Sequence, residues 1–193
     1  ADKALGTAKE LSSRIALTER EQGHLAALDA WCAGNIDGAA DAWEGVLLDH
    51  PTDILALRLA HFAHFYAGDG TKMRDSVARV LTSWDRAQPL YGNLIGMYGF
   101  GLEESGDYRR GERMAREAVD IDPKDAWSVH AVAHVMEMEG RHREGIDWIQ
   151  GLEPHWSSVH NFRFHVWWHR TLFHLERYEF DTVLELYDSQ VAS

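Results

Sequence analysis

Three side chains at helical spacing, His130, His134 and Glu137, are the residues best suited to chemistry. They read H-x-x-x-H-x-x-E. On a helix, residues three and four apart share a face, so the three groups would stack along it. His165 and His169 repeat the four-residue spacing. Imidazole pairs at this spacing chelate transition metals, and a carboxylate one turn away would complete the ligand set. The pattern therefore predicts a site for Zn, Fe or Mn made of these five residues.

The pattern differs from the H-E-x-x-H motif of zinc metalloproteases. Ala131 follows His130, so the general base built into that motif is missing. If the site is catalytic, we expect Glu103 or Glu137 to act as the base, with His134 as a further acid–base residue. No glycine-rich phosphate-binding loop occurs in the sequence.

Helices must position these side chains, because apolar residues recur at three- and four-residue spacing without strand-like alternation. Two stretches align when Pro51 is placed on Pro123, and Gly34 then falls on Gly106. A third copy has Gly140 at the same place. A glycine between two helices and a proline after the second are typical of the 34-residue tetratricopeptide repeat.

The whole chain is predicted to be one all-α domain, a tetratricopeptide-repeat α-solenoid of about five helix pairs. In the last pair Tyr178 stands where the turn glycine is usual, and each proline is expected where a helix has ended. The expected pairs cover roughly residues 20–53, 54–87, 92–125, 126–157 and 164–193.

Stacked helix pairs form an extended concave surface lined by the first helix of each pair. Besides the five residues above, we expect this groove to present the side chains of His24, His61, His64, Asn93, Tyr98, Trp127 and Trp168. A single histidine on a half-buried helix face is usually a hydrogen-bonded structural residue. The convergence of several histidines and glutamates is what favours a ligand-binding role.

Composition excludes several classes of partner. The 193 residues are 45% apolar and carry a net charge of −12, so the chain can bury a core but lacks the basic surface that nucleic acids and anionic membranes require. No apolar run approaches the roughly 20 residues that span a bilayer. The single cysteine, Cys32, lies among apolar residues and allows no internal disulfide, which indicates a reducing compartment such as the cytoplasm.

The segments LIGMYGFGLEESGDY, DAWSVHAVAHVMEM and HVWWHRTLFHLERYEFDTVLELYD resemble the tetratricopeptide repeat protein 38 family, in order and over nearly the whole chain. The resemblance implies a helical-repeat fold and the central part of a longer protein, so we expect association with flanking segments or with a second copy. The histidines and glutamate that match the family are His61, His130, His134, Glu137, His165 and His169. Tyr178 and the residues around His64 depart from the family's sequence pattern.

Two functions remain open at this point. The first is a binding protein whose groove holds a small molecule, a peptide or a partner protein. The second is a metal-dependent or acid–base enzyme that uses the same histidines and glutamates. A third use of crowded imidazoles is a pH-responsive seam that loosens when they are protonated.

Overall fold

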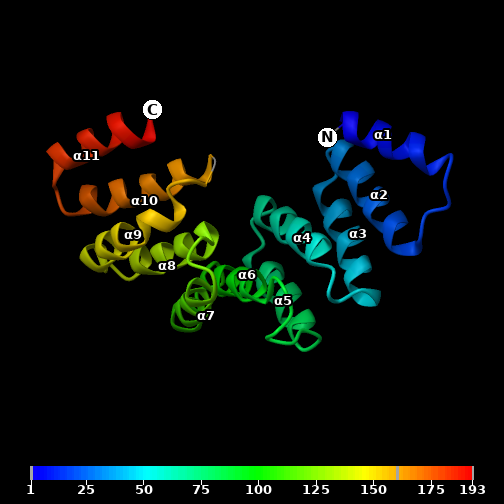
Figure 1. Ribbon diagram of the computed structural model, residues 1–193, viewed down its shortest axis with the longest axis horizontal. Coiled ribbons are helices and arrows are strands. Elements are labelled where there is room, and N and C mark those ends of the chain that lie inside the picture. Colours follow the sequence, from blue (N-terminus) through cyan, green and yellow to red (C-terminus); the bar gives the residue numbers. More distant parts are fainter. Residues whose placement is uncertain (1, 160, 193) are drawn as a thin grey trace. The chain divides into compact units, whose positions relative to one another are not determined.

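The computed structural model describes residues 2–159 and 161–192, and all regular structure in these ranges is helical (Figure 1). The described α-helices are α1 (Asp2–Ser12), α2 (Glu19–Cys32), α3 (Ile36–Asp49), α4 (Ile54–Tyr66), α5 (Gly70–Leu81), α6 (Tyr91–Glu103), α7 (Tyr108–Ile121), α8 (Ala126–Met138), α9 (His142–Trp156), α10 (Phe162–Glu176) and α11 (Phe180–Leu186). A π-helical turn, Tyr187–Val191, follows α11. The predicted all-α fold of about five helix pairs is confirmed, because α2 to α11 pair in sequence after α1.

The chain divides into two compact units, Ala1–Leu94 and Ile95–Ser193. The boundary falls inside α6, so the first unit holds α1 to α5 and the second holds α7 to α11 with most of α6. A single continuous domain therefore stays a prediction. None of the described helices is both long and apolar enough to cross a membrane.

Short acidic or amide side chains cap the N-termini of α3, α4, α5, α7 and α8. Asp53 accepts hydrogen bonds from the backbone N–H groups of Leu55 and Ala56 at the start of α4. Asp125 does the same for Trp127 and Ser128 at the start of α8. Such caps satisfy backbone donors that have no partner within the helix. The cap at Asp125 thus sets where α8 begins and where its histidines lie.

The turn inside each helix pair uses one residue with positive φ. These residues are Gly34, Gly68, Gly106 and Gly140, with φ between 68° and 80°, and Tyr178, with φ of 59°. Glycine adopts this left-handed conformation without steric cost, whereas a residue with a Cβ is strained there. The repeat therefore keeps its turn geometry in the fifth pair despite the tyrosine.

Glycines also let the helices of the second unit approach closely. A Cβ on Gly99 in α6 would lie 2.8 Å from the backbone nitrogen of Ala115 in α7. A Cβ on Gly145 in α9 would lie 2.4 Å from the ring of Phe173 in α10. Both distances are well inside van der Waals contact, so these positions fix the spacing of the helices around α8.

One proline departs from the expectation that each marks a helix end. Pro154 lies inside α9, which continues to Trp156. Its missing N–H removes one hydrogen bond from the last turn. The Trp156 ring is fully buried and lies 5.3 Å from the ring of Trp167 in α10, so tertiary packing holds the last turn together.

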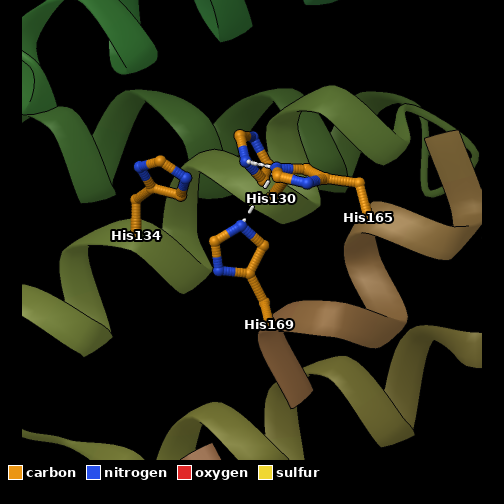
Figure 2. Close-up of side chains that lie close together, drawn as sticks. All are labelled: His130, His134, His165 and His169. Carbon is orange, nitrogen blue, oxygen red and sulfur yellow. Dashed lines mark hydrogen bonds between the residues drawn. The ribbon is translucent and has the colours of Figure 1, made fainter. Parts of the chain in front are cut away.

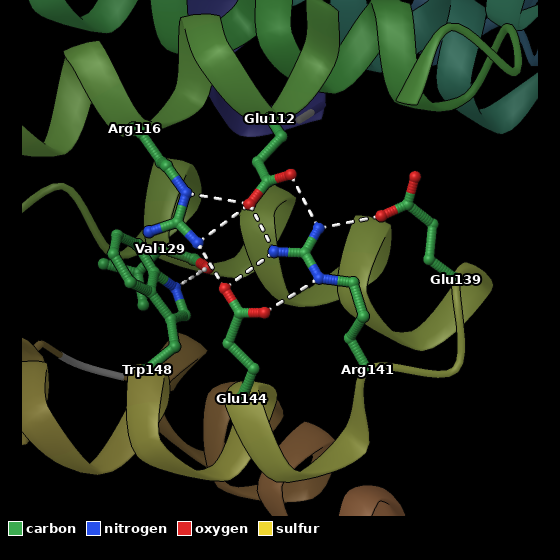
Figure 3. A network of polar contacts seen from close by, with 7 residues as sticks. All are labelled: Glu112, Arg116, Val129, Glu139, Arg141, Glu144 and Trp148. Atoms are coloured by element: carbon green, nitrogen blue, oxygen red, sulfur yellow. Dashed lines mark hydrogen bonds and ion pairs between the residues drawn. The ribbon is translucent and has the colours of Figure 1, made fainter. Parts of the chain in front are cut away.

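A charged network joins α7 to the start of α9 (Figure 3). Arg141 donates to both carboxylate oxygens of Glu112, at 2.7 and 2.9 Å, and to Glu144 at 2.7 and 2.9 Å. Beside it the guanidinium of Arg116 lies 4.5 Å from the ring centroid of Trp148, and the indole N–H of Trp148 donates to the Val129 carbonyl of α8. The network therefore ties α7 to α9, and α9 to α8, on this side.

Candidate metal centre

Four histidines come together where α8 packs against α10, both in the second unit (Figure 2). His130 and His134 lie one turn apart on α8, and His165 and His169 lie one turn apart on α10. One ring nitrogen from each of the four lies within 4.8 Å of the others. The two i, i+4 pairs predicted from the sequence thus face each other across a single helix–helix contact.

The Nε2 atom of His165 lies at the centre of the cluster. It is 2.9 Å from Nε2 of His130 and 3.1 Å from Nε2 of His169. A ring nitrogen carries either one hydrogen or one lone pair, so it makes one good hydrogen bond and cannot satisfy both neighbours equally. Nitrogens bound to one metal ion at 2.0–2.1 Å in tetrahedral geometry are about 3.3 Å apart. The observed separations are close to that spacing.

Burial favours the neutral form of His130, His165 and His169, which is the form that binds metals. His130 and His169 are 3% and 7% exposed. Burial, followed by the charges of the neighbouring histidines, lowers the pKa of His130 well below its usual value and that of His169 to about 2. The exposed His165 also has a lowered pKa, from its partial desolvation and the charge of His134. Within the described residues, Nδ1 of His130 and Nδ1 of His169 are buried without a hydrogen-bond partner.

His134 has a different environment on each side of its ring. One nitrogen faces the other three histidines and the second faces away from them (Figure 2). The second is Nδ1, which lies 3.4 Å from Oε2 of Glu103 and 3.8 Å from Oε1 of Glu104. Carboxylates beside the outer nitrogen of a histidine orient it as a metal ligand in many metal sites.

Aromatic rings enclose the cluster on one side. The ring of Phe162 lies 5.2 Å from that of His130 and 5.2 Å from that of Trp127. Phe100 lies 5.5 Å from both His130 and His134. These rings restrict water around the nitrogens, which strengthens electrostatic interactions there.

Other predicted site residues of the second unit lie apart from the four histidines. Glu137 is not among the potential metal ligands that lie within 4.8 Å of one another. Burial raises its pKa, and its charged neighbours are His142, Glu176 and His134. The hydroxyl of Tyr98 accepts a hydrogen bond from Arg110 of α7. Trp168 is 40% exposed on α10. Roles for these residues stay predictions.

The remaining predicted groove residues belong to the first unit. His24 contacts Asp53 at 2.8 Å, and His64 contacts Glu44 at 3.0 Å. His61 is fully buried, and burial, with the charges of Arg58 and His64, lowers its pKa to about 3.

Asn93 is half-buried near the start of α6. His24, His61 and His64 have neighbours within the first unit. The convergence of these residues and Asn93 with the four histidines on one groove stays a prediction.

Sequence reasoning missed two residues at the site. Glu104 follows the last residue of α6, where helical periodicity no longer fixes the direction of a side chain. Phe162 is the first residue of α10, one turn before His165. For Glu104, the only available signal in the sequence was its position next to Glu103. For Phe162, the signal was its i, i+3 spacing to His165.

Comparison with known proteins supports the fold and nothing finer. No family model matches the chain. It is similar to a thermophilic tetratricopeptide-repeat protein of Thermus thermophilus, with a TM-score of 0.66 at 12% identity over 90% of each chain. MamA of Desulfovibrio magneticus gives a TM-score of 0.64 at 15% identity, covering 91% of this chain and 99% of that one. PilF of Pseudomonas aeruginosa gives 0.65 at 14% identity, covering 90% and 75%. The chain therefore has the fold of tetratricopeptide-repeat proteins.

Proposed function

We propose that this chain is a tetratricopeptide-type binding protein that holds a transition-metal ion at His130, His134, His165 and His169. The observation that carries the proposal is the convergence of four ring nitrogens within 4.8 Å from two packed helices. An ion among them would use the lone pairs that now crowd around Nε2 of His165. The all-nitrogen ligand set favours Zn²⁺, Ni²⁺, Cu²⁺ or Fe²⁺ over Mg²⁺ or Ca²⁺.

Metal binding also accounts for the burial of these imidazoles. A buried histidine with a lowered pKa makes the fold less stable in acid. As a metal ligand it contributes binding free energy that only the folded chain can realise. Two of the four are nine-tenths buried, whereas His165 is exposed and leaves an approach to the cluster.

The test is a titration of the purified full chain, stripped with a chelator, with Zn²⁺ followed by calorimetry and with Co²⁺ followed by visible absorption. We expect saturable binding at the four-histidine cluster and loss of at least 100-fold in affinity for a His130→Ala/His169→Ala variant. His165→Ala, at an exposed position, removes a ligand with little risk to folding and should weaken binding by a similar factor. A variant with His50→Ala and His155→Ala, both exposed, is the matched control.

Unaltered affinity in His165→Ala, or no binding by the parent chain, would refute the metal site. Circular dichroism of each variant shows whether a loss of binding reflects loss of fold.

A second candidate function is a protein-interaction scaffold, favoured by the tetratricopeptide-type fold itself. The 40% exposed Trp168 on α10 is the aromatic side chain expected to contact a peptide or small molecule there. Screening a peptide library against the parent chain and against Trp168→Ala tests this idea. If every recovered peptide binds both proteins equally, this face is not the binding surface. The enzyme alternative, membership of the tetratricopeptide repeat protein 38 family and a cytoplasmic location stay predictions.

A further inference from the structure

A second set of potential ligands lies on the far side of His134. Glu103 ends α6, and Glu104 follows it directly. Their carboxylates and Nδ1 of His134 offer one ligand atom each, all within 4.8 Å of one another. This group shares only His134 with the four-histidine cluster. One nitrogen of the shared imidazole faces the other three histidines (Figure 2). The other, Nδ1, lies 3.4 Å from Oε2 of Glu103 and 3.8 Å from Oε1 of Glu104.

Glu103 is the unusual member of this group. The residue is 6% exposed, and its Oε2 is buried without a hydrogen-bond partner among the described residues. That atom lies 3.4 Å from Nδ1 of His134. A carboxylate oxygen that is removed from water and left without a hydrogen bond carries a desolvation cost. The fold nevertheless places it here, since the backbone of Gly111 in α7 holds this end of α6 in close contact.

Glu104 adds a second carboxylate to the same space. Its side chain is 30% exposed. Two ionised carboxylates crowded beside one imidazole nitrogen repel each other, and a positive charge between them relieves that repulsion.

Among the described residues, no lysine or arginine makes an ion pair with Glu103 or Glu104. By contrast, Glu112 makes ion pairs with Arg116 and Arg141. A bound cation would supply the missing charge.

We propose that Glu103, Glu104 and Nδ1 of His134 bind a second divalent cation, so that His134 links two metal ions through its two ring nitrogens. The inference rests on the proposed four-histidine site for the first ion. Two carboxylates and one imidazole suit Mn²⁺, Fe²⁺ or Zn²⁺, with water completing the coordination. Coordination of both nitrogens requires His134 to give up its remaining ring proton, which passes to the solvent when the second ion binds.

The experiment counts ions in the chelator-stripped full chain. Zn²⁺ is added in excess, loosely held metal is removed by gel filtration, and bound metal is measured by mass spectrometry. We expect two ions per parent chain and one per Glu103→Gln/Glu104→Gln variant. Glu104→Gln alone, at the more exposed position, should weaken the second site at least tenfold. Asp147→Asn, an exposed carboxylate of α9, is the control and should keep two ions.

Two further readouts separate a linked pair of ions from an incidental acidic contact. Calorimetry in buffers of different ionisation enthalpy should show that full loading releases one more proton from the parent chain than from Glu103→Gln/Glu104→Gln. With Cu²⁺ as probe, two ions joined by one imidazole are magnetically coupled, so the electron paramagnetic resonance signal of the fully loaded parent should fall below that of the variant at equal copper.

The outcomes distinguish the two proposals. A parent chain that binds one ion, lost in His165→Ala and kept in Glu103→Gln/Glu104→Gln, overturns the second site and leaves the first intact. A parent chain that binds no ion overturns both. Two ions in both the parent and the glutamine variant show that the second ion sits elsewhere, which also refutes this inference.

Discussion

Acid should destabilise this protein well above the pH at which its carboxylates titrate. Two buried histidines, one in each unit, should each contribute to this loss of stability. His61 in the first unit has its pKa lowered to about 3, and His169 in the second unit to about 2, in both cases mainly by burial. The usual value is 6.5. Above pH 6.5 both groups are neutral in the folded and the unfolded chain, so they contribute no pH dependence. Below it the unfolded chain binds protons first, and the free energy of unfolding falls.

The size of the effect follows from the width of that window. Each such histidine lowers the free energy of unfolding by about 1.4 kcal/mol per pH unit between pH 6.5 and its folded pKa. At pH 5.0, 1.5 units below the upper limit, His61 and His169 should each cost about 2 kcal/mol. Globular domains have a total stability of about 5–15 kcal/mol, so the loss is a large share of it.

Urea unfolding followed by circular dichroism at pH 7.5 and 5.0, with a chelator present, measures this loss. In His61→Gln and in His169→Gln the drop in unfolding free energy between the two pH values should be about 2 kcal/mol smaller than in the parent. Glutamine in a buried site costs stability equally at both pH values, so that cost cancels in the difference. Other groups, including Glu104 and Glu137, whose raised pKa values act in the opposite direction, cancel in the same way.

His50→Gln and His155→Gln serve as exposed controls and should keep the parent's drop. If the two units unfold in separate transitions, His61→Gln should affect one and His169→Gln the other. The reasoning fails if either buried variant loses as much stability on acidification as the parent, because its histidine would then titrate normally in the folded chain.

Three further substitutions test the packing around the site, each measured by the midpoint of thermal or urea unfolding. Gly99→Ala should lower the free energy of unfolding by about 1–3 kcal/mol, because the new Cβ meets the backbone of α7. Gly151→Ala, which has open space beside it, should raise the free energy of unfolding by about 1 kcal/mol. Equal effects of the two substitutions would contradict the close contact at Gly99. Tyr178→Gly should stabilise the fifth turn by about 1 kcal/mol, because the 80% exposed ring leaves little packing to lose, and a loss would show that the ring is needed. Asp53→Asn should cost less than Asp53→Ala, for which we expect about 2 kcal/mol, because only the former can keep the cap of α4.

Much of the fold could be predicted from the sequence because its determinants are local. The glycines at the turns of three pairs and the apolar spacing between them fix helix positions without knowledge of distant contacts. Pro154 was misjudged because burial of Trp156 outweighs the local preference of proline to end a helix. The division into two units inside α6 has no local signature, since the apolar pattern continues across it.

The four histidines were predictable for a related reason. His165 and His169 stand 35 residues after His130 and His134, about one repeat length. Stacked repeats bring equivalent positions of their first helices side by side, so the repeat spacing carries the long-range contact. Glu137 shares the helix face of His130 but lies seven residues, about 10 Å, further along the axis. Its place on the correct face therefore did not bring it to the cluster.

The carboxylates decide whether this cluster is structural or functional. Buried imidazoles alone could be explained as packing, since neutral rings fit well among Phe100, Trp127 and Phe162. Packing gives no reason for Glu103, whose buried Oε2 lies beside His134 without a hydrogen bond. A leucine there would remove the desolvation cost and keep the contact with α8. A glutamate in that place is explained when His134 must be oriented toward, or share, a positive ion.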